Sequence, residues 1–254
     1  MIEGLSVLAV IPARGGSQGL ARKNLREVAG RSLLARAIAA GRQAATVDRV
    51  ILSSDDAEII QAALLAGCEV PFVRPAELAT AEARSIDALR HALRMLPERY
   101  DLVALLQPTS PLRASQDVDG AVRLCVETGA PACVSVSEAG KTPFWMHTLD
   151  PGGRMRPILP EYQMVPRRQD LPAAYDINGA VFVARSEWLF GHEDFLSPET
   201  VGYVMPKERS IDIDDELDLI IAEAVAQRVE GDGDKADTPA TPITPAAGRG
   251  RASG

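Results

Sequence analysis

The sequence predicts an α/β fold in which a mostly parallel sheet is flanked by helices. Short apolar runs rich in β-branched residues recur along the chain, as in strands that are buried on both faces. Segments with apolar residues at helical spacing separate these runs, and alternating strands and helices favour a parallel sheet covered on both sides. A basic, glycine-rich loop directly follows the first run, at the place where open α/β sheets bind ligands.

Composition narrows the class of protein. The chain has 254 residues, enough for one domain or for one domain with an appendage, and its 46% hydrophobic and 24% charged content is that of a globular protein. The net charge of −8 argues against general nucleic-acid binding, and no apolar run approaches the ~20 residues that span a bilayer. Three cysteines without metal-site spacing and the lack of a signal-peptide pattern predict buried free thiols in a cytoplasmic protein.

The first predicted strand begins at Val7 and ends at Pro12, where the basic loop begins. The loop contains Arg14, Gly15, Gly16, Gly19, Arg22 and Lys23, and six basic residues against one acidic residue lie from Arg14 to Arg36. Its glycine spacing matches neither the dinucleotide fingerprint nor the Walker A loop. Successive N–H groups in such a loop can bind an anion. We therefore expect a small, phosphate-rich ligand, with an ordinary surface turn as the alternative.

Helices are predicted where a capping residue precedes a helical apolar pattern. Ser32 would cap a helix over 32–44, and Ser85 would cap a helix that reaches Leu96. Ser115 would start a third helix that ends at about Thr128. Asp55 and Glu58 would form a capping box for a further helix. Asp55 and Asp56 could instead meet a metal or a ribose. A last helix is predicted over 216–229.

Further strands are predicted over residues 50–52, 70–73, 101–106, 132–136, 179–184 and 201–205. The strand over 101–106 ends at the polar loop 107–113, which two prolines make stiff. The segment 138–175 is too long for a plain connection, so we expect it to cover the site or to pair with another subunit. The globular domain would comprise residues 1–230, and the tail 231–254 is expected to be disordered because its composition cannot form a core.

Asp212 and Asp214 follow in an extended segment, with Ile211 and Ile213 alternating between them. Residues two apart share a face, so the two carboxylates would point together while the isoleucines face the core. Such a pair suits magnesium, which takes one or two carboxylates and completes its shell with phosphate and water. The alternative is that both acids merely favour the start of the helix that follows.

Together these blocks resemble the acylneuraminate cytidylyltransferases. The resemblance covers residues 5 to about 228 and rests on the ordered matches 11–17, 19, 22–24, 53–56, 74–79, 85–87, 106–113, 167–169, 178–179 and 210–214. It implies a Rossmann-like nucleotidyltransferase fold, CTP and a nonulosonic acid as substrates, and Mg²⁺ or Mn²⁺ as cofactor. It also implies a homodimer formed through the segment 138–175.

The same resemblance assigns site residues. The CTP-binding residues would be Ala13, Arg14, Gly15, Gly16, Ser17, Lys23, Asn24, Arg74, Ala83 and Ser85. The sugar acid would be bound by Gln107, Thr109, Ser110, Arg168 and Asn178, with Arg168 on the carboxylate. Asp212 and Asp214 match the metal-binding aspartates, and Arg14 and Lys23 join them as catalytic candidates.

The sequence departs from the family pattern at a few positions. Gln18 stands where lysine is usual, Ala21 where proline is usual, and Asp176 where bacterial relatives often carry a basic residue. Asp176 leaves the identity of the sugar open, so legionaminic, pseudaminic and 3-deoxy-octulosonic acids are alternatives to a sialic acid. A non-catalytic nucleotide-binding protein is the alternative of another class.

Overall fold

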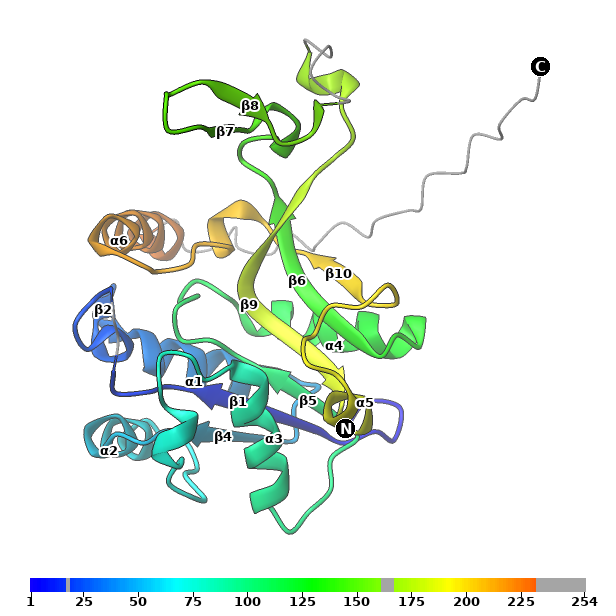
Figure 1. Ribbon diagram of the computed structural model, residues 1–254. Coiled ribbons are helices and arrows are strands. Elements are labelled where there is room, and N and C mark those ends of the chain that lie inside the picture. The colour runs from blue at the N-terminus through cyan, green and yellow to red at the C-terminus, as the bar shows by residue number, and fades with distance from the viewer. Residues whose placement is uncertain (17–18, 161–166, 232–254) are drawn as a thin grey trace.

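The computed structural model describes residues 1–16, 19–160 and 167–231. Its centre is a six-stranded sheet with the strand order β10-β6-β9-β5-β1-β4 (Figure 1). The strands are β1 (Val7–Pro12), β4 (Arg49–Ser53), β5 (Leu102–Leu105), β6 (Ala132–Glu138), β9 (Tyr175–Arg185) and β10 (Val201–Val204). The predicted α/β class with a mostly parallel, Rossmann-like sheet is confirmed.

One strand runs against the others. β1 pairs in parallel with β4 and β5, and β10 pairs in parallel with β6. β9 is antiparallel to both of its neighbours, β5 and β6. A parallel return needs a crossover connection, whereas β9 re-enters the sheet directly from the long excursion after β6. Apolar residues alone did not reveal this direction.

Helices cover both faces of the sheet. Helices α1 (Leu33–Gln43), α2 (Ala57–Leu65) and α4 (Ser115–Thr128) pack on one face through a shared core cluster. Helices α3 (Ser85–Met95) and α5 (Ser186–Gly191) pack on the other. Alternate residues of β1 divide between the two clusters, as expected for a strand buried on both sides.

A third core cluster lies beside the sheet under helix α6 (Glu216–Gly231), next to the small ribbon of β2 (Glu27–Val28) and β3 (Arg31–Ser32). Leu20 of the glycine-rich loop, Leu33 of α1 and Ile213 of the aspartate segment are all buried in it. Two segments nearly two hundred residues apart in sequence are thereby held side by side by apolar packing.

Three local predictions were wrong. Residues 70–73 form no strand, and only an isolated bridge joins Glu69 to Ile51. Helix α2 is capped by Asp56, which accepts hydrogen bonds from the backbone N–H groups of Glu58 and Ile59, and not by Asp55. Ser85 is the first residue of α3 and provides no cap. Both N-caps differ from prediction by one position, and at α3 the N-cap residue Arg84 makes no side-chain cap hydrogen bond.

Between β6 and β9 the chain leaves the sheet as a projecting arm, defined here as residues 139–160 and 167–174. The arm carries a hairpin of β7 (His147–Leu149) and β8 (Met155–Pro157), seen at the top of Figure 1. No helix within the described ranges is both long and apolar enough to cross a membrane. The predicted tail lies outside the described residues from position 232 onward.

Candidate active site

A cavity of about 520 Å³ opens at the carboxyl ends of β1 and β5. Its walls are Pro12, Arg14, Gly19, Lys23, Asn24, Arg74, Leu78, Ala81, Ala83, Arg84, Ser85, Gln107, Pro108, Thr109, Asp212 and Asp214. Loops distant in sequence meet there because the carboxyl ends of parallel strands share one edge of the sheet. Many of the predicted site residues are therefore neighbours in space.

The loop after β1 is fixed at its start by backbone contacts. The N–H of Ala13 donates to the carbonyl of Ser53 at 3.0 Å, and the N–H of Gly15 donates to Oδ1 of Asp55 at 3.2 Å. The buried amide of Asn24 donates to the carbonyl of Arg14 at 3.1 Å, closing the loop. Asn24 thus holds the loop in shape and also lines the cavity. Ser17 and Gln18 lie outside the described residues.

Gly19 touches the aspartate segment. A Cβ atom at this position would lie 2.7 Å from the backbone oxygen of Asp214, a distance that real Cβ atoms do not adopt. Gly16, by contrast, has open space around its would-be Cβ. The requirement for glycine at position 19 is therefore steric, and its cause is Asp214.

Lys23 connects the same two segments through polar contacts. Its Nζ donates to the carbonyl of Ile213 at 2.7 Å and lies 3.1 Å from Oδ1 of Asp214. The lysine side chain is 15% exposed and the Asp214 side chain 81% exposed. A largely buried ammonium thus faces the cavity beside a carboxylate that solvent still reaches.

Two arginines bring further positive charge. Nη1 of Arg14 donates to the carbonyl of Thr80. Arg74 is buried, donates through Nε to Oγ of Ser53 at 3.0 Å, and also donates to the carbonyl of Ser53. Burial lowers the pKa of Arg74 to about 10 while nearby Asp55 opposes the shift, so this guanidinium remains charged at neutral pH.

Asp212 is a half-buried acid in the wall of the cavity. Its Oδ1 is buried and has no hydrogen-bond partner in the described part of the chain. Burial raises the pKa of Asp212, the Thr109 side chain opposes the shift by hydrogen bonding, and the charge of Asp214 adds to it. A buried oxygen without a partner in a cavity wall is a group that a ligand can satisfy.

Helix α6 does not need Asp212 or Asp214 at its start. Asp215 accepts hydrogen bonds from the N–H groups of Leu217 and Asp218 at 2.9 and 3.1 Å. Asp218 in turn accepts from the N–H groups of Asp214 and Asp215. The side chains that cap the start of α6 are thus Asp215 and Asp218, which sequence reasoning missed.

The donor set is compatible with magnesium. In the described residues no group of three or more histidine, cysteine or acidic side chains could hold a metal ion. Asp212 and Asp214 offer two carboxylates, one with an unpartnered buried oxygen and one open to solvent. Magnesium commonly uses one or two carboxylates together with substrate phosphates and water, so such a pair fits it.

The loop after β5 forms the opposite wall. Gln107 and Thr109 line the cavity, and the carbonyl of Thr109 accepts a hydrogen bond from the N–H of Ile213 at 2.8 Å. Ser110 is fully buried and its Oγ donates to the carbonyl of Asn178 at 3.4 Å. Gln107 and Thr109 therefore face the cavity, whereas Ser110 lies behind it.

Asn178 also has its polar groups engaged within the protein. Its Oδ1 accepts from Oγ of Ser135 at 2.6 Å and from the N–H of Ala180, and its Nδ2 donates to Oγ of Ser210 at 2.9 Å. It sits where the β6–β9 register shifts, next to Gly179 at a φ of +72°. Asn178 joins β6, β9 and the segment before Asp212 but does not line the cavity.

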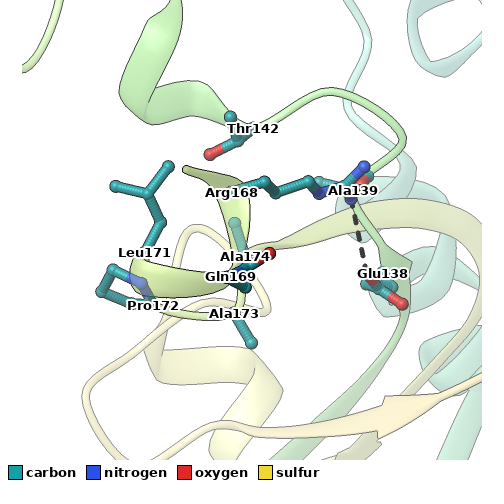
Figure 2. Close-up of a pocket in the computed structure, with 9 residues that line it drawn as sticks. All are labelled: Glu138, Ala139, Thr142, Arg168, Gln169, Leu171, Pro172, Ala173 and Ala174. Atoms are coloured by element: carbon teal, nitrogen blue, oxygen red, sulfur yellow. Dashed lines mark hydrogen bonds and ion pairs between the residues drawn. The ribbon is translucent and has the colours of Figure 1, made fainter. Parts of the chain in front are cut away.

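Arg168 lies elsewhere. It lines a second cavity of about 400 Å³ at the base of the arm, shown in Figure 2. Its Nη2 donates to the carbonyl of Ala139 at 2.8 Å and lies 3.4 Å from Oε1 of Glu138. The structure does not bring Arg168 to the cavity that contains the other candidates.

Sequence reasoning also missed part of the cavity wall. Arg84 lines the cavity and pairs with Asp87 and Glu193, and Leu78 and Ala81 contribute apolar surface. Arg84 directly precedes the predicted residue Ser85, so its position was the available signal. The apolar pair carries no chemical signal, because small aliphatic residues are common in any loop.

A mostly parallel sheet with a basic glycine-rich loop facing paired aspartates defines a protein of the nucleotidyltransferase class. The sequence profile of the family described as "Cytidylyltransferase" matches residues 8–213. The chain belongs to the cytidylyltransferase family.

Its relatives include enzymes named for different sugar acids. It is 34% identical over 223 residues to an N-acylneuraminate cytidylyltransferase of Escherichia coli, covering 87% of this chain and 52% of that one. It is 32% identical to a CMP-N,N'-diacetyllegionaminic acid synthase of Legionella pneumophila, covering 88% and 97%. A pseudaminic acid cytidylyltransferase of Campylobacter jejuni is also 32% identical, covering 85% and 94%. The chain thus spans about half the length of the first relative.

Solved structures show the same fold. A CMP:2-keto-3-deoxy-manno-octonic acid synthetase complexed with CTP has a TM-score of 0.65 at 18% identity, covering 88% of this chain and 100% of that one. A 4-diphosphocytidyl-2C-methyl-D-erythritol synthase from Anaerococcus prevotii has a TM-score of 0.62 at 16% identity, covering 89% and 100%. At these identities the likeness concerns the fold alone.

Proposed function

We propose that this chain transfers CMP from CTP to the anomeric hydroxyl of a nonulosonic acid and releases pyrophosphate. The observation that carries the proposal is the meeting of the β1 loop, Lys23 and Asp212 in one cavity of a cytidylyltransferase-family chain. The names of the relatives support a sialic-type acid as acceptor, with legionaminic or pseudaminic acid as the alternative by the same chemistry. A non-catalytic nucleotide-binding role is the less favoured alternative, since Arg14, Lys23 and both aspartates line the cavity.

CTP would lie with its phosphates against the β1 loop. Arg14 and Lys23 offer positive charge to the triphosphate, with Ala13, Gly15, Gly16 and Ser17 along the loop. The base would lie toward Arg74, Ala83 and Ser85, which form the wall on the α3 side. Asn24, which also lines the cavity, would hold the loop in shape through its hydrogen bond to the carbonyl of Arg14.

The proposed metal is Mg²⁺, with Mn²⁺ as a substitute, held by Asp212 and Asp214. When bound, the ion would neutralise charge on the phosphates and help orient them. Oδ1 of Asp212 supports this assignment, because it is a buried oxygen without a partner among the described residues. Lys23 already contacts Asp214 at 3.1 Å, so cation and carboxylate would be arranged around the same phosphates.

The reaction follows from alignment and charge neutralisation. The anomeric oxygen forms a bond to the α-phosphorus as the bond to the bridging oxygen of pyrophosphate breaks, and the hydroxyl proton is released. Holding the two reactants in line makes a bimolecular step effectively unimolecular, and cations stabilise the charge that shifts to the leaving group. Arg14 and Lys23 would supply this charge from the protein.

The sugar acid would occupy the side of the cavity formed by Gln107 and Thr109, beside Asp212. Ser110 and Asn178 would shape this wall from behind through their mutual hydrogen bond. Arg168 is proposed to bind the carboxylate, since a guanidinium can pair with it through two hydrogen bonds. Because Arg168 lines the separate cavity at the arm, the acid would have to extend toward the arm.

We further propose that the protein is a cytoplasmic homodimer that pairs through the arm. Large apolar side chains are exposed on this segment, namely Trp145, Met146, Leu149, Met155 and Ile158. A projecting hairpin with several exposed apolar residues is typical of an interaction surface.

The proposed cytoplasmic location is supported by the three buried free cysteines, which fit a reducing compartment.

The test is pyrophosphate release from CTP and Mg²⁺ with a panel of nonulosonic acids. The panel contains N-acetylneuraminic, diacetyllegionaminic, pseudaminic and 3-deoxy-octulosonic acids, each with and without enzyme. Release with at least one nine-carbon acid supports the proposal, and the preferred acid identifies the substrate. Absence of release with every acid would refute the enzymatic function.

A further inference from the structure

A buried carboxylate on α4 lies behind the candidate active site. Asp117 is fully buried, and Arg209 binds it through the Nε–Nη2 edge of its guanidinium. Nε of Arg209 donates to Oδ2 at 2.8 Å and Nη2 donates to Oδ1 at 2.9 Å. Such two-point pairing fixes orientation as well as distance. Neither residue lines the cavity.

Arg209 immediately precedes the segment that carries the proposed metal ligands. It ends the short helix η6 (Lys207–Arg209), three residues before Asp212. The next residue, Ser210, accepts a hydrogen bond from the amide of Asn178 at 2.9 Å. The path of the chain into Asp212 is thus set on one side by Asp117 and on the other by Asn178.

A second arginine, just before the start of α4, contacts the opposite wall of the cavity. Arg113 is buried, and its Nη1 donates to the carbonyls of Gln107 at 3.0 Å and Ala180 at 2.6 Å. Burial lowers the pKa of Arg113 and the negative charge of Asp117 opposes this shift. Arg113 makes no hydrogen bond to Asp117 in the described part of the chain, so the carboxylate holds the Asp212 segment through Arg209 and acts on Arg113 only through its charge.

Asp117 also caps α4 by accepting a hydrogen bond from the N–H of Ala114 at 2.9 Å, but capping does not require a paired arginine. A buried ion pair contributes little net stability, because desolvating the charges offsets their attraction. Its geometry, however, is specific, and small misplacements of reacting groups reduce rates strongly. Partners that orient metal ligands from behind commonly affect metal affinity by about 10- to 100-fold.

We propose that the Asp117–Arg209 pair is a positioning device that sets the Asp212–Asp214 segment against the Gln107–Thr109 wall, so that acids and loop face one cavity. The inference rests on the proposed function, in which Asp212 and Asp214 hold Mg²⁺. Asp117 and Arg209 act through the backbone that they hold and make no contact with substrates.

The test compares Arg209→Lys with Arg90→Lys. Arg90 is the control, because its side chain is 14% exposed against 16% for Arg209 and it also pairs with an aspartate, although Asp87 is 29% exposed and Asp117 is fully buried. It joins α3 to α5 on the other face of the sheet, where Nε donates to the carbonyl of Leu189. Both variants keep the positive charge and lose the planar, two-point donor.

We expect Arg209→Lys to raise the Mg²⁺ concentration for half-maximal pyrophosphate release by about tenfold. The affinity for Mn²⁺ alone, followed by the electron paramagnetic resonance signal of the free ion, should fall by a similar factor. Arg90→Lys should lower the melting temperature without changing either metal readout. Equal metal readouts for wild type and a folded Arg209→Lys would overturn the proposal.

Two further measurements separate the causes of failure. If Arg209→Lys does not fold, judged by circular dichroism, Asp117→Asn takes its place, since it keeps the shape of the side chain and removes its charge. Weakened Mn²⁺ binding in that variant supports the proposal, and wild-type Mn²⁺ binding refutes it. If wild type releases no pyrophosphate with any acid, the proposed function fails, while Mn²⁺ binding still decides whether the pair positions the aspartates.

Discussion

Nζ of Lys23 lies 3.1 Å from Oδ1 of Asp214, although the two residues are 191 positions apart in the sequence. The same ammonium donates to the carbonyl of Ile213 at 2.7 Å. One cation thereby joins the loop that is proposed to bind phosphates to the segment that is proposed to bind the metal. The contact links the two halves of the candidate site.

Lys23→Ala should lower kcat/KM for CTP by roughly 100-fold, because it removes a cation from the phosphates and frees the aspartate segment. Steady-state pyrophosphate release measures the effect. Arg26→Ala is the control, since Arg26 joins the same regions through Glu216 at 2.8 Å but lies outside the cavity. An exposed pair of this kind contributes little, so activity should stay near wild type. Equal losses in both variants would contradict a specific role of Lys23.

Gly19→Ala should impair the enzyme, because the added Cβ would lie 2.7 Å from the backbone oxygen of Asp214 and force the two segments apart. We expect a rise in the KM for CTP and in the Mg²⁺ requirement. Gly191→Ala provides the comparison, since its Cβ would meet no atom within 4 Å and Gly191 does not line the cavity. Both variants are titrated with CTP and Mg²⁺, and a Gly19→Ala enzyme that matches Gly191→Ala would contradict the steric account.

Asp212→Asn should abolish turnover and yet raise the melting temperature of the metal-free protein at neutral pH. Burial raises the pKa of Asp212 above its ordinary value of 3.8, so the folded state favours the neutral carboxyl. That favourable contribution is present at pH below the ordinary pKa and is lost as the pH rises through the raised pKa. At neutral pH the folded protein therefore holds a disfavoured charge, which asparagine removes.

Differential scanning calorimetry in the presence of a chelator measures this effect. The stability advantage of Asp212→Asn should shrink as the pH is lowered toward 4. A variant that is inactive and less stable at neutral pH would instead indicate that Asp212 supports the fold. A variant that keeps full activity would remove Asp212 from the proposed metal site.

Much of the fold followed from local patterns, because buried strands and amphipathic helices carry their periodicity in the sequence. The limits of α4 and the cap of α1 by Ser32 were predictable for this reason. The direction of β9 was not, since it depends on how the arm returns to the sheet. The cap of α2 was displaced by one residue, which sequence alone leaves open when Asp55 and Asp56 are adjacent.

The candidate site divides in the same way. The β1 loop, Gln107 and the two aspartates carry chemical signals in short stretches, and the fold brings them to one cavity. Asp117 and Arg209 were missed, because charged residues read as surface until the fold buries them together. Arg168 was expected with the others but lines a separate cavity. Its position depends on the path of the arm, which the short motif around Arg168 does not reveal.

The fate of the α-phosphate of CTP tests the central claim most directly. With CTP labelled at the α-phosphate, Mg²⁺ and the preferred nonulosonic acid, the label should move into a CMP–sugar acid. Label at the γ-phosphate should leave in pyrophosphate. Label from the γ-phosphate in the sugar product, or no sugar product from any acid of the panel, would contradict cytidylyl transfer by this chain.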